Sequence, residues 1–425
     1  MSKIKLLVLS AWASRVITAI AGIFSIRILN NQLPVEEYAI YIVIMGISGW
    51  FAIIGDPGIG YQTQNKVSEK IAIGKNYSID ILSAYILLFS VAIFIFFLSY
   101  ILRNPITFFL FEKLDYYDRG SLSQTFLVVA FIYSIGMAAS VSSKFLYATG
   151  KGAFGNMLTA FGSLLGLLIL HLGLKDSHNK ILYSVIAVTI PGMTLSVFLA
   201  IHQIKKSWNS LNLITFNQLL SVVKNSRGFF FFSLVAASII QVDYLIMSQK
   251  IKPIEIAQYY NLAKIFSFLA FINQSILYAL WPDFTQKFIR NEFKDIKNSI
   301  KKVILLTSVF TLITTIILIL TSKYFGIIFK SGDEIIYRNT VIFGFGFIAL
   351  LRCISDPCAI FLQSINNLRP IIICAAVQAP ISFLLQWIFS TYFSIEGIIL
   401  GFSCAFLMTA FWVQPFLVMK KLGKL

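Results

Sequence analysis

Long apolar runs dominate this chain and limit what it can fold into. Twelve runs lie close to the ~20 residues that a helix needs to cross a bilayer. They are continuous and lack the alternation of a barrel strand, so helices are the only realistic structure for them. The sequence therefore predicts an all-α polytopic membrane protein with spans near 8–29, 39–60, 79–101, 122–142, 153–173, 182–202, 229–248, 257–280, 303–322, 340–362, 370–391 and 396–418.

The composition excludes an ordinary soluble domain. Hydrophobic residues make up 58% of the chain and charged residues 12%, with a mean hydropathy of +0.81, whereas soluble domains hold about 25% charged residues. The net charge of +17 does not indicate nucleic-acid binding, because the charges lie in short loops between apolar runs. Four cysteines in apolar segments lack metal-ligand spacing, and we interpret them as small packing residues.

The N-terminus resembles a signal peptide but is better interpreted as a first transmembrane helix. Lys3 and Lys5 precede an apolar run that ends in a small-residue stretch at 19–22. Arg15 interrupts that run, which continues to about Leu29. With a cytoplasmic N-terminus, roughly twice as many Lys and Arg side chains fall in the inside loops as in the outside loops, which predicts that both termini are cytoplasmic.

A basic polar segment divides the chain into halves of six runs each. We predict an N-terminal six-helix bundle at 1–203, a cytoplasmic linker at 204–228 and a C-terminal six-helix bundle at 229–425. Part of the linker, 211–223, fits either an amphipathic surface helix or an ordinary connection.

The two halves also resemble each other in sequence. "LPVEEYAIY" at 33–41 aligns with "KPIEIAQYY" at 252–260, and the hydropathy patterns run in parallel. Six helices per repeat give both halves the same topology, with a pseudo-two-fold axis along the membrane normal and a site between them.

Two cations lie inside apolar runs, where a charge costs about 2.5–3.5 kcal/mol. Arg15 is about seven residues into the first run, so its side chain either extends to the cytoplasmic surface or faces a cavity. Small and polar residues from Ser14 to Ser25 share its side of the helix, which favours the cavity. Lys264 shares a helix face with Tyr260 and Asn261, a combination that suits a ligand bearing phosphate and sugar. The alternative is a polar stripe packed against neighbouring helices.

Carboxylates within the runs are candidates for ion coupling. Arg352 and Asp356 are spaced to meet on one helix face, either as a self-neutralising ion pair or as a substrate anion site positioned by the aspartate. Asp243 lies in the outer third of its run and is the stronger coupling candidate, because burial raises a carboxylate pKa toward usable values. Asp56, in "GDPG", is either a coupling group or a structural carboxylate at a helix end.

Nothing in the sequence indicates catalysis or a bound cofactor. It contains no Walker loop, and the "GFGF" fragment at 344–347 lies within an apolar run. We predict a protein that is not an enzyme and that has no metal site, with H⁺ or Na⁺ as the coupling ion.

The stretch "RILNNQLPVEEYAIYIVI", the "IGDPGIG" segment and the two six-helix halves resemble the Wzx-type polysaccharide flippases of the multidrug/oligosaccharidyl-lipid/polysaccharide flippase superfamily. The resemblance implies a MATE-like fold of two bundles in a V around a central cavity. It implies a bacterial inner-membrane protein that moves O-antigen or other polysaccharide repeat units on undecaprenyl diphosphate to the periplasmic leaflet.

In related lipid II flippases, arginines on helices 1 and 8 line the cavity and engage the diphosphate. The matching helices here carry Arg15 and Lys264, and Arg352 is a third candidate for the diphosphate. Polysaccharide polymerase and chain-length proteins are implied partners. Two alternatives stay open: a MATE-like drug or metabolite antiporter, and a membrane-embedded glycan polymerase or ligase.

Overall fold

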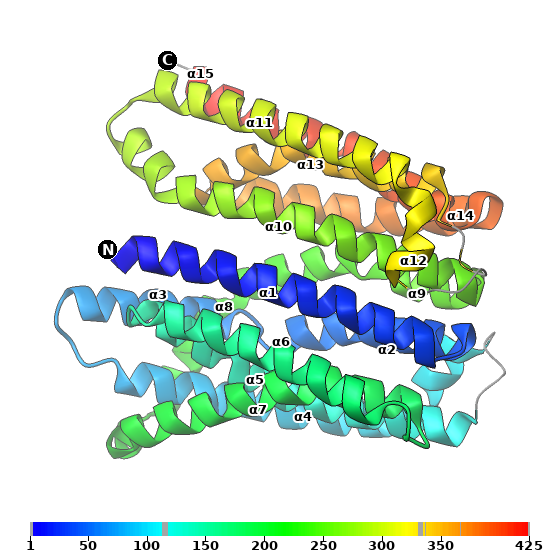
Figure 1. Cartoon of the computed structure of the whole chain (residues 1–425). Coiled ribbons are helices and arrows are strands. Elements are labelled where there is room, and N and C mark those ends of the chain that lie inside the picture. The colour runs from blue at the N-terminus through cyan, green and yellow to red at the C-terminus, as the bar shows by residue number, and fades with distance from the viewer. Residues whose placement is uncertain (1–2, 113–117, 330–334, 336, 366, 424–425) are drawn as a thin grey trace. The chain divides into compact units, whose positions relative to one another are not determined.

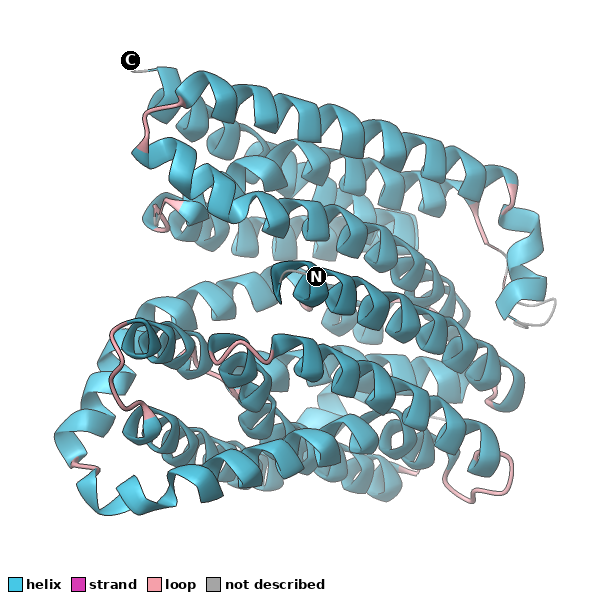
Figure 2. Cartoon of the chain, turned by 60° about the vertical axis from the view of Figure 1, so that its left-hand side comes forward, coloured by secondary structure: helices cyan, strands magenta, loops and turns pink. Residues whose placement is uncertain are grey.

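The computed structural model describes residues 3–112, 118–329, 335, 337–365 and 367–423. Within this part of the chain, helices are joined by short connections and no β-strand occurs (Figure 2). Nine helices among the described residues are long and apolar enough to cross a membrane. The prediction of an all-helical polytopic membrane protein is therefore confirmed.

The structure supports the predicted number of twelve membrane spans only in part. One of the nine segments, Arg369–Gly423, covers both of the last two predicted runs. The run at 39–60 crosses the non-helical residues 55–58 between the helices Val35–Ile54 and Ile59–Ala72, and the run at 257–280 lies in the helix Pro253–Ile289. None of these three helices is among the nine. The number of twelve stays a prediction.

The chain divides into two compact units, Met1–Ala237 and Ser238–Leu425. The helices of the first unit (Figure 1) are α1 (Lys3–Gln32), α2 (Val35–Ile54), α3 (Ile59–Ala72), α4 (Ser78–Phe111), α5 (Arg119–Ala148), α6 (Gly152–Gly173), α7 (Lys180–Ser207), the 3₁₀ helix η1 (Trp208–Leu213) and most of α8 (Phe216–Ile240). The second unit holds the end of α8, α9 (Val242–Lys250), α10 (Pro253–Ile289), α11 (Phe293–Leu320), the 3₁₀ helix η2 (Ser322–Tyr324), α12 (Phe325–Phe329), α13 (Asn339–Ser364), α14 (Arg369–Met408) and α15 (Ala410–Gly423).

The segment predicted as a linker is largely helical. Residues 204–228 contain the end of α7, η1 and the first half of α8, and α8 continues through residue 228 to Ile240. The predicted amphipathic segment 211–223 thus overlaps the start of a longer helix. The boundaries of the predicted bundles remain predictions.

The helices of the two units pack in the same order, as the sequence repeat predicts. In the first unit, α5 packs against both α4 and α7, and α1 runs along α6, as Figure 1 shows. In the second unit, α13 packs against both α11 and α15, and α9 lies against α14. Pro34 directly precedes α2 and Pro253 begins α10, so the aligned prolines mark equivalent helix starts.

The core of the first unit combines aromatic packing with buried hydrogen bonds. The rings of Tyr85 and Phe145 meet edge to face at 5.5 Å, and both side chains are fully buried. The Tyr85 hydroxyl donates to Gln203 Oε1 at 2.6 Å, and the Gln203 amide donates to the Ser142 carbonyl at 3.0 Å. These bonds join α4, α5 and α7, so a polar network fixes the arrangement of three apolar helices.

The last two predicted runs form a tight helical reversal at Ser394. This residue has φ 53° and ψ −130° inside α14, a conformation that non-glycine residues rarely adopt. Its hydroxyl donates to Glu255 Oε2 at 2.5 Å. Arg338 binds the other Glu255 oxygen at 2.5 Å and Glu396 at 3.1 Å, so one ionic network holds the strained turn.

Two glycines let the helical segments on either side of this turn pack backbone to backbone. A Cβ at Gly401 would lie 2.5 Å from the Gln386 nitrogen, and one at Gly397 would meet the Phe389 carbonyl. The contacts pair positions after the turn with positions before it in reverse order. The two segments are therefore antiparallel neighbours with no room for side chains between them.

We expect Gly401→Ala to lower the midpoint of thermal unfolding in detergent by several degrees. Overpacking costs about 1–3 kcal/mol, and here the added carbon meets backbone that cannot rotate away. Gly228→Ala is the control, because a Cβ there has no neighbour within 4 Å. Equal midpoints for the two variants, measured on purified protein, would contradict the close approach of the two segments.

Candidate functional site

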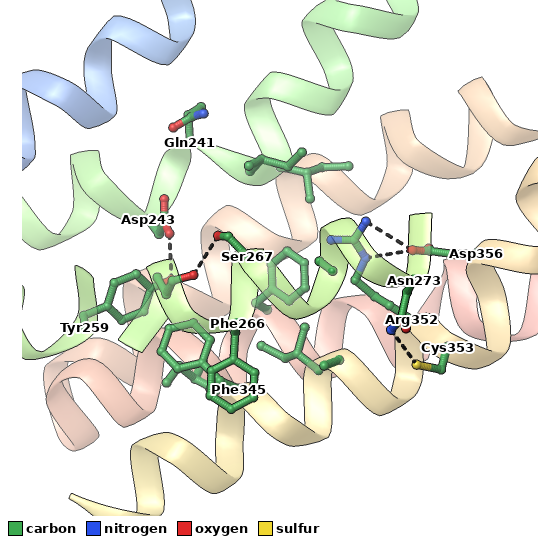
Figure 3. Close-up of a pocket in the computed structure, with 18 of the residues that line it drawn as sticks. Gln241, Asp243, Tyr259, Phe266, Ser267, Asn273, Phe345, Arg352, Cys353 and Asp356 are labelled. Atoms are coloured by element: carbon green, nitrogen blue, oxygen red, sulfur yellow. Dashed lines mark hydrogen bonds and ion pairs between the residues drawn. The ribbon is translucent and has the colours of Figure 1, made fainter. Parts of the chain in front are cut away.

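A pocket of about 340 Å³ lies within the second unit and collects several of the predicted polar residues. Residues from α8 to α11, α13 and α14 line it. Its polar and charged lining residues are Gln241, Asp243, Tyr244, Tyr259, Ser267, Asn273, Thr307, Arg352, Asp356 and Gln386. Figure 3 shows the two acidic groups at opposite ends, with aromatic rings between them.

Asp243 stands at the break between two helices. α8 ends at Ile240, and Asp243 lies in the first turn of α9, where a negative charge suits the helix N-terminus. Tyr259 donates its hydroxyl to Asp243 Oδ2 at 2.7 Å, and the Tyr244 N–H donates to Oδ1 at 2.9 Å. The carboxylate is half-buried and keeps lone pairs for a proton or a cation.

Arg352 and Asp356 form the ion pair that their spacing predicts. Arg352 Nε and Nη2 both lie 3.2 Å from Asp356 Oδ2, and both side chains are half-buried on α13 (Figure 3). The pair thus lines the pocket, and both interpretations of it stay open. It neutralises itself within the helix, and its guanidinium also faces a space that an anion could enter.

Aromatic side chains separate the two charged ends. The rings of Phe266 and Phe345 stack at 5.5 Å with an interplanar angle of 18°, and Tyr259 meets Phe345 at 5.0 Å. This wall fixes Tyr259 and thereby positions the hydroxyl that binds Asp243. The rings also give the pocket an apolar middle.

Two buried acceptors in the pocket lining were not predicted. Gln386 Oε1 and Asn273 Oδ1 have no hydrogen-bond partner among the described residues. Gln386 is fully buried, with its amide nitrogen bound to Ser382 at 2.8 Å. Buried acceptors without donors are rare and call for a ligand or water. The sequence feature that could have indicated Gln386 is its amide side chain within the apolar run at 370–391.

Lys264, Tyr260 and Asn261 do not line this pocket. Lys264 is exposed, and its Nζ lies 5.0 Å from the centre of the Tyr260 ring, a cation–π contact. Tyr260 itself is buried. Asn261 is fully buried and donates to the Tyr337 hydroxyl at 2.9 Å. The structure thus exposes the cation and places the amide within the helix packing.

Arg15 lies on α1 in the first unit and is half-buried. The small-residue side that it borders packs against α6: Thr18 accepts from Ser163 at 3.3 Å, and Ser10 accepts from Asn156 at 3.1 Å. Ser14 is buried on that side. The stripe of small residues therefore serves helix packing, and Arg15 lies at its border.

Asp56 occupies a structural position at a helix start. Its Oδ1 accepts from the Gly60 N–H at 2.9 Å, and Oδ2 pairs with Lys144 at 2.6 Å. Gly58 between the helices adopts φ 77°, which favours glycine. The side chain is only 8% exposed. These contacts agree with the interpretation of Asp56 as a helix-end carboxylate.

No family model matches the chain. It is 30% identical to a protein of Yersinia pseudotuberculosis provisionally named an O-antigen export protein, over 96% of this chain and 94% of that protein. It is 31% identical to a Salmonella typhimurium protein provisionally named an O-antigen transporter, over 98% and 96% of the two chains.

Solved structures of transporters share the fold. An inward-facing MATE family multidrug transporter of the MOP superfamily matches with a TM-score of 0.79 at 11% identity, over 98% of this chain and 99% of that one. The lipid II flippase MurJ in an inward closed conformation matches with a TM-score of 0.74 at 18% identity, over 99% and 89%.

We expect Arg352→Met to destabilise the protein more than Arg352→Met combined with Asp356→Leu. The single change leaves a carboxylate without its partner, whereas the double change removes both charges. A cycle of the two single variants and the double variant should give a coupling energy of about 0.5–3 kcal/mol. Thermal unfolding in detergent measures it, and additive effects would show that the pair contributes no stability.

Proposed function

Because this chain belongs to the O-antigen transporter family within the multidrug/oligosaccharidyl-lipid/polysaccharide flippase superfamily, we propose that it flips a lipid-linked glycan repeat unit across the membrane. It is a multi-pass membrane protein with a MATE-like fold. Its relatives are named transporters, so it is a transporter and not an enzyme, and a polymerase or ligase activity is set aside.

One observation carries the proposal. The sequence match spans 94–96% of the relatives, so the likeness is not confined to one part of those transporters. The likeness to multidrug transporters concerns the fold alone. A drug or metabolite antiporter with this fold remains the second candidate, but cations within the spans disfavour a cationic drug as its substrate.

The proposed substrate is a glycan on undecaprenyl diphosphate, moved from the cytoplasmic to the periplasmic leaflet of the inner membrane. A diphosphate carries concentrated negative charge, and Arg15 and Lys264 supply one cation from each unit. Lysine at position 264 keeps the charge but lacks the bidentate fork of arginine. Arg352 adds a third cation. The Tyr260 ring lies beside Lys264 but is buried, so a sugar could stack on it only in another conformation of the protein.

The proposed transport cycle is alternating access between two six-helix bundles. With both termini cytoplasmic, a central cavity first opens inward and takes up the diphosphate and glycan, while the polyprenyl tail stays in the bilayer. The halves then rock so that the cavity opens outward. Polymerase and chain-length proteins would receive the flipped repeat unit.

The proposed coupling group is Asp243. It lies half-buried in the pocket next to Tyr259, and Gln386 Oε1 lines the same pocket without a hydrogen-bond donor. A carboxylate with neutral oxygen neighbours in a spanning segment can bind H⁺ or Na⁺ and release it on the other side. Asp356 is less suited to this role because Arg352 already neutralises it. Asp56 is less suited because Lys144 neutralises it.

We expect Arg15→Glu combined with Lys264→Glu to abolish glycan export while the protein remains in the membrane. Reversed charges repel the diphosphate instead of binding it. Surface glycan is measured by gel in a strain whose chromosomal copy has been deleted, together with the lipid-linked intermediate that accumulates inside. Matched control changes are Arg27→Glu on the same helix and Lys323→Glu, whose Nζ lies 5.6 Å from the Tyr324 ring. Normal export with both positions reversed would overturn the role of the cations.

Asp243→Asn should remove the dependence of transport on an ion gradient. In proteoliposomes, an imposed H⁺ or Na⁺ gradient is expected to accelerate flipping by the unaltered protein several-fold, whereas an amide cannot be protonated and binds cations weakly. The exposed Asp295 supplies the control, Asp295→Asn, which should keep the acceleration. Gradient-driven acceleration that persists in Asp243→Asn would exclude this residue as the coupling group.

A further inference from the structure

The connection between α7 and α8 in the first unit forms an elbow, residues 205–227, that belongs to none of the sites described so far. The 3₁₀ helix η1 ends at Leu213, and Ile214 is extended with φ −80° and ψ 120°. A capping box then starts α8. The Gln218 N–H donates to Thr215 Oγ1 at 3.4 Å, and the Thr215 N–H donates to Gln218 Oε1 at 3.1 Å. The chain therefore turns at these residues, and α8 begins as a separate helix.

The inner face of α8 is held in the core of the first unit. Val222 is 3% exposed and belongs to the same buried cluster as Tyr85, Phe145 and Ala200. These three residues lie within about two turns of the ends of α4, α5 and α7. The start of α8 therefore lies at one end of the first unit and packs against it.

The outward surface of the elbow has an apolar side and a polar side. Phe216, Leu220 and Val223 are 47–77% exposed, and at 3.6 residues per turn they fall within an arc of about 60°. On η1, Trp208 is 58% and Leu213 59% exposed. Three exposed polar residues occupy the neighbouring side of α8: Asn217, Ser221 and Asn225. Helix α8 is thus amphipathic on the surface that it turns away from the core.

Four cations accompany this surface, in a stretch of sequence without acidic residues. Lys205, Lys206, Lys224 and Arg227 are all exposed, and residues 177–242 contain no Asp or Glu. On α8, Lys224 falls between the apolar and the polar side. Arg227 falls on the apolar side, from which its long side chain can extend to water. The elbow is therefore a basic surface with an apolar side.

The helical segment that contains α8 is too long to lie entirely in hydrocarbon. Phe216–Lys250 has 35 residues, whereas about 20 residues cross the core of a bilayer. On the order of 15 residues therefore lie outside the core. The end at 216–228 is suited to that position, because Lys224, Arg227 and the exposed amides would be costly in hydrocarbon.

Neither water nor hydrocarbon alone suits both sides of the elbow. In hydrocarbon, the polar side would lose its hydrogen bonds to water. In water, large apolar side chains would stay solvated. At the membrane surface, the apolar side contacts the boundary of the acyl chains while the polar side faces water, as in interfacial amphipathic helices. A tryptophan such as Trp208 also favours this depth.

We propose that the elbow, residues 205–227, docks on a bilayer surface of anionic phospholipid. Phe216, Leu220 and Val223 insert at the boundary of the acyl chains, and the four cations lie next to lipid phosphates, which attract basic segments. The occupant is a membrane rather than an acidic protein, because the cations border an apolar side at the end of a membrane-spanning unit. The proposal is independent of the substrate that the protein moves.

Spin labels on cysteines introduced into the full-length protein in lipid nanodiscs test the placement. Labels at Leu220→Cys and Val223→Cys should have a ratio of oxygen collisions to nickel-chelate collisions several-fold higher than labels at Asn217→Cys and Asn225→Cys. The unaltered protein, labelled in the same way, gives the background from its own cysteines. Chelate contact at all four positions would show a helix in water, and its exclusion from all four would show a helix in hydrocarbon. Either result would overturn the proposal.

Removal of charge tests the class of lipid. In phosphatidylglycerol nanodiscs, changing the four cations of the elbow to glutamine should raise chelate contact at position 220 several-fold. The unaltered elbow in pure phosphatidylcholine should show the same rise, because the attraction of the anionic surface is missing. The matched control changes four exposed lysines of α11 to glutamine and should leave the contact unchanged: Lys294, Lys297, Lys301 and Lys302. Equal insertion without the cations or without phosphatidylglycerol would show docking by apolar contact alone and would overturn the anionic-lipid assignment.

Salt supplies a measurement that needs no change of charge in the protein. At about 1 M salt the Debye length falls to about 3 Å, so the lipid phosphates attract the elbow less. Chelate contact at position 220 should then rise in phosphatidylglycerol nanodiscs and stay constant in phosphatidylcholine. Contact that does not respond to salt in phosphatidylglycerol would contradict the role of the four cations.

Discussion

The cost of a charge in hydrocarbon governs where the polar side chains of this protein lie. An ionised group at mid-membrane costs about 2.5–3.5 kcal/mol on insertion scales, so each must pair, reach the interface or face a wet space. Asp56 pairs with Lys144, Arg352 pairs with Asp356, and the buried Asp80 pairs with both Lys66 and Lys70. Asp243 differs from these carboxylates because its side-chain contact is the neutral hydroxyl of Tyr259. That difference sets Asp243 apart from these three paired aspartates.

Much of the architecture follows from patterns along the chain. The apolar runs predict helices. The alignment of 33–41 with 252–260 predicts a repeat, and in the structure Pro34 and Pro253 both stand at helix starts. Local spacing was also sufficient for the Arg352–Asp356 ion pair, because both residues lie on one helix. The helix-end interpretation of Asp56 came from the neighbouring glycines and proline in "GDPG".

The sequence does not predict which side chains of different helices meet, because these contacts depend on how each helix is rotated about its axis. The sequence pattern places Asn261 on one helix face with Lys264, yet one turn of helix separates an exposed cation from an amide buried against Tyr337. The sequence favours Tyr260 as a binding residue, although it is the neighbouring Tyr259 that binds Asp243. The reversal at Ser394 was predicted as a gap between two runs, but the glycine contacts that close it became visible only in three dimensions.

The pocket in the second unit has a consequence for the environment of its charges. The pocket of about 340 Å³ has room for on the order of ten water molecules, and acceptors such as Gln386 Oε1 and Asn273 Oδ1 supply polar partners that ordered water needs. The stacked rings of Phe266 and Phe345 lie between the two charged ends. Water held at either end would therefore be separated by an apolar layer, and an ion moving from one end to the other would have to pass these rings.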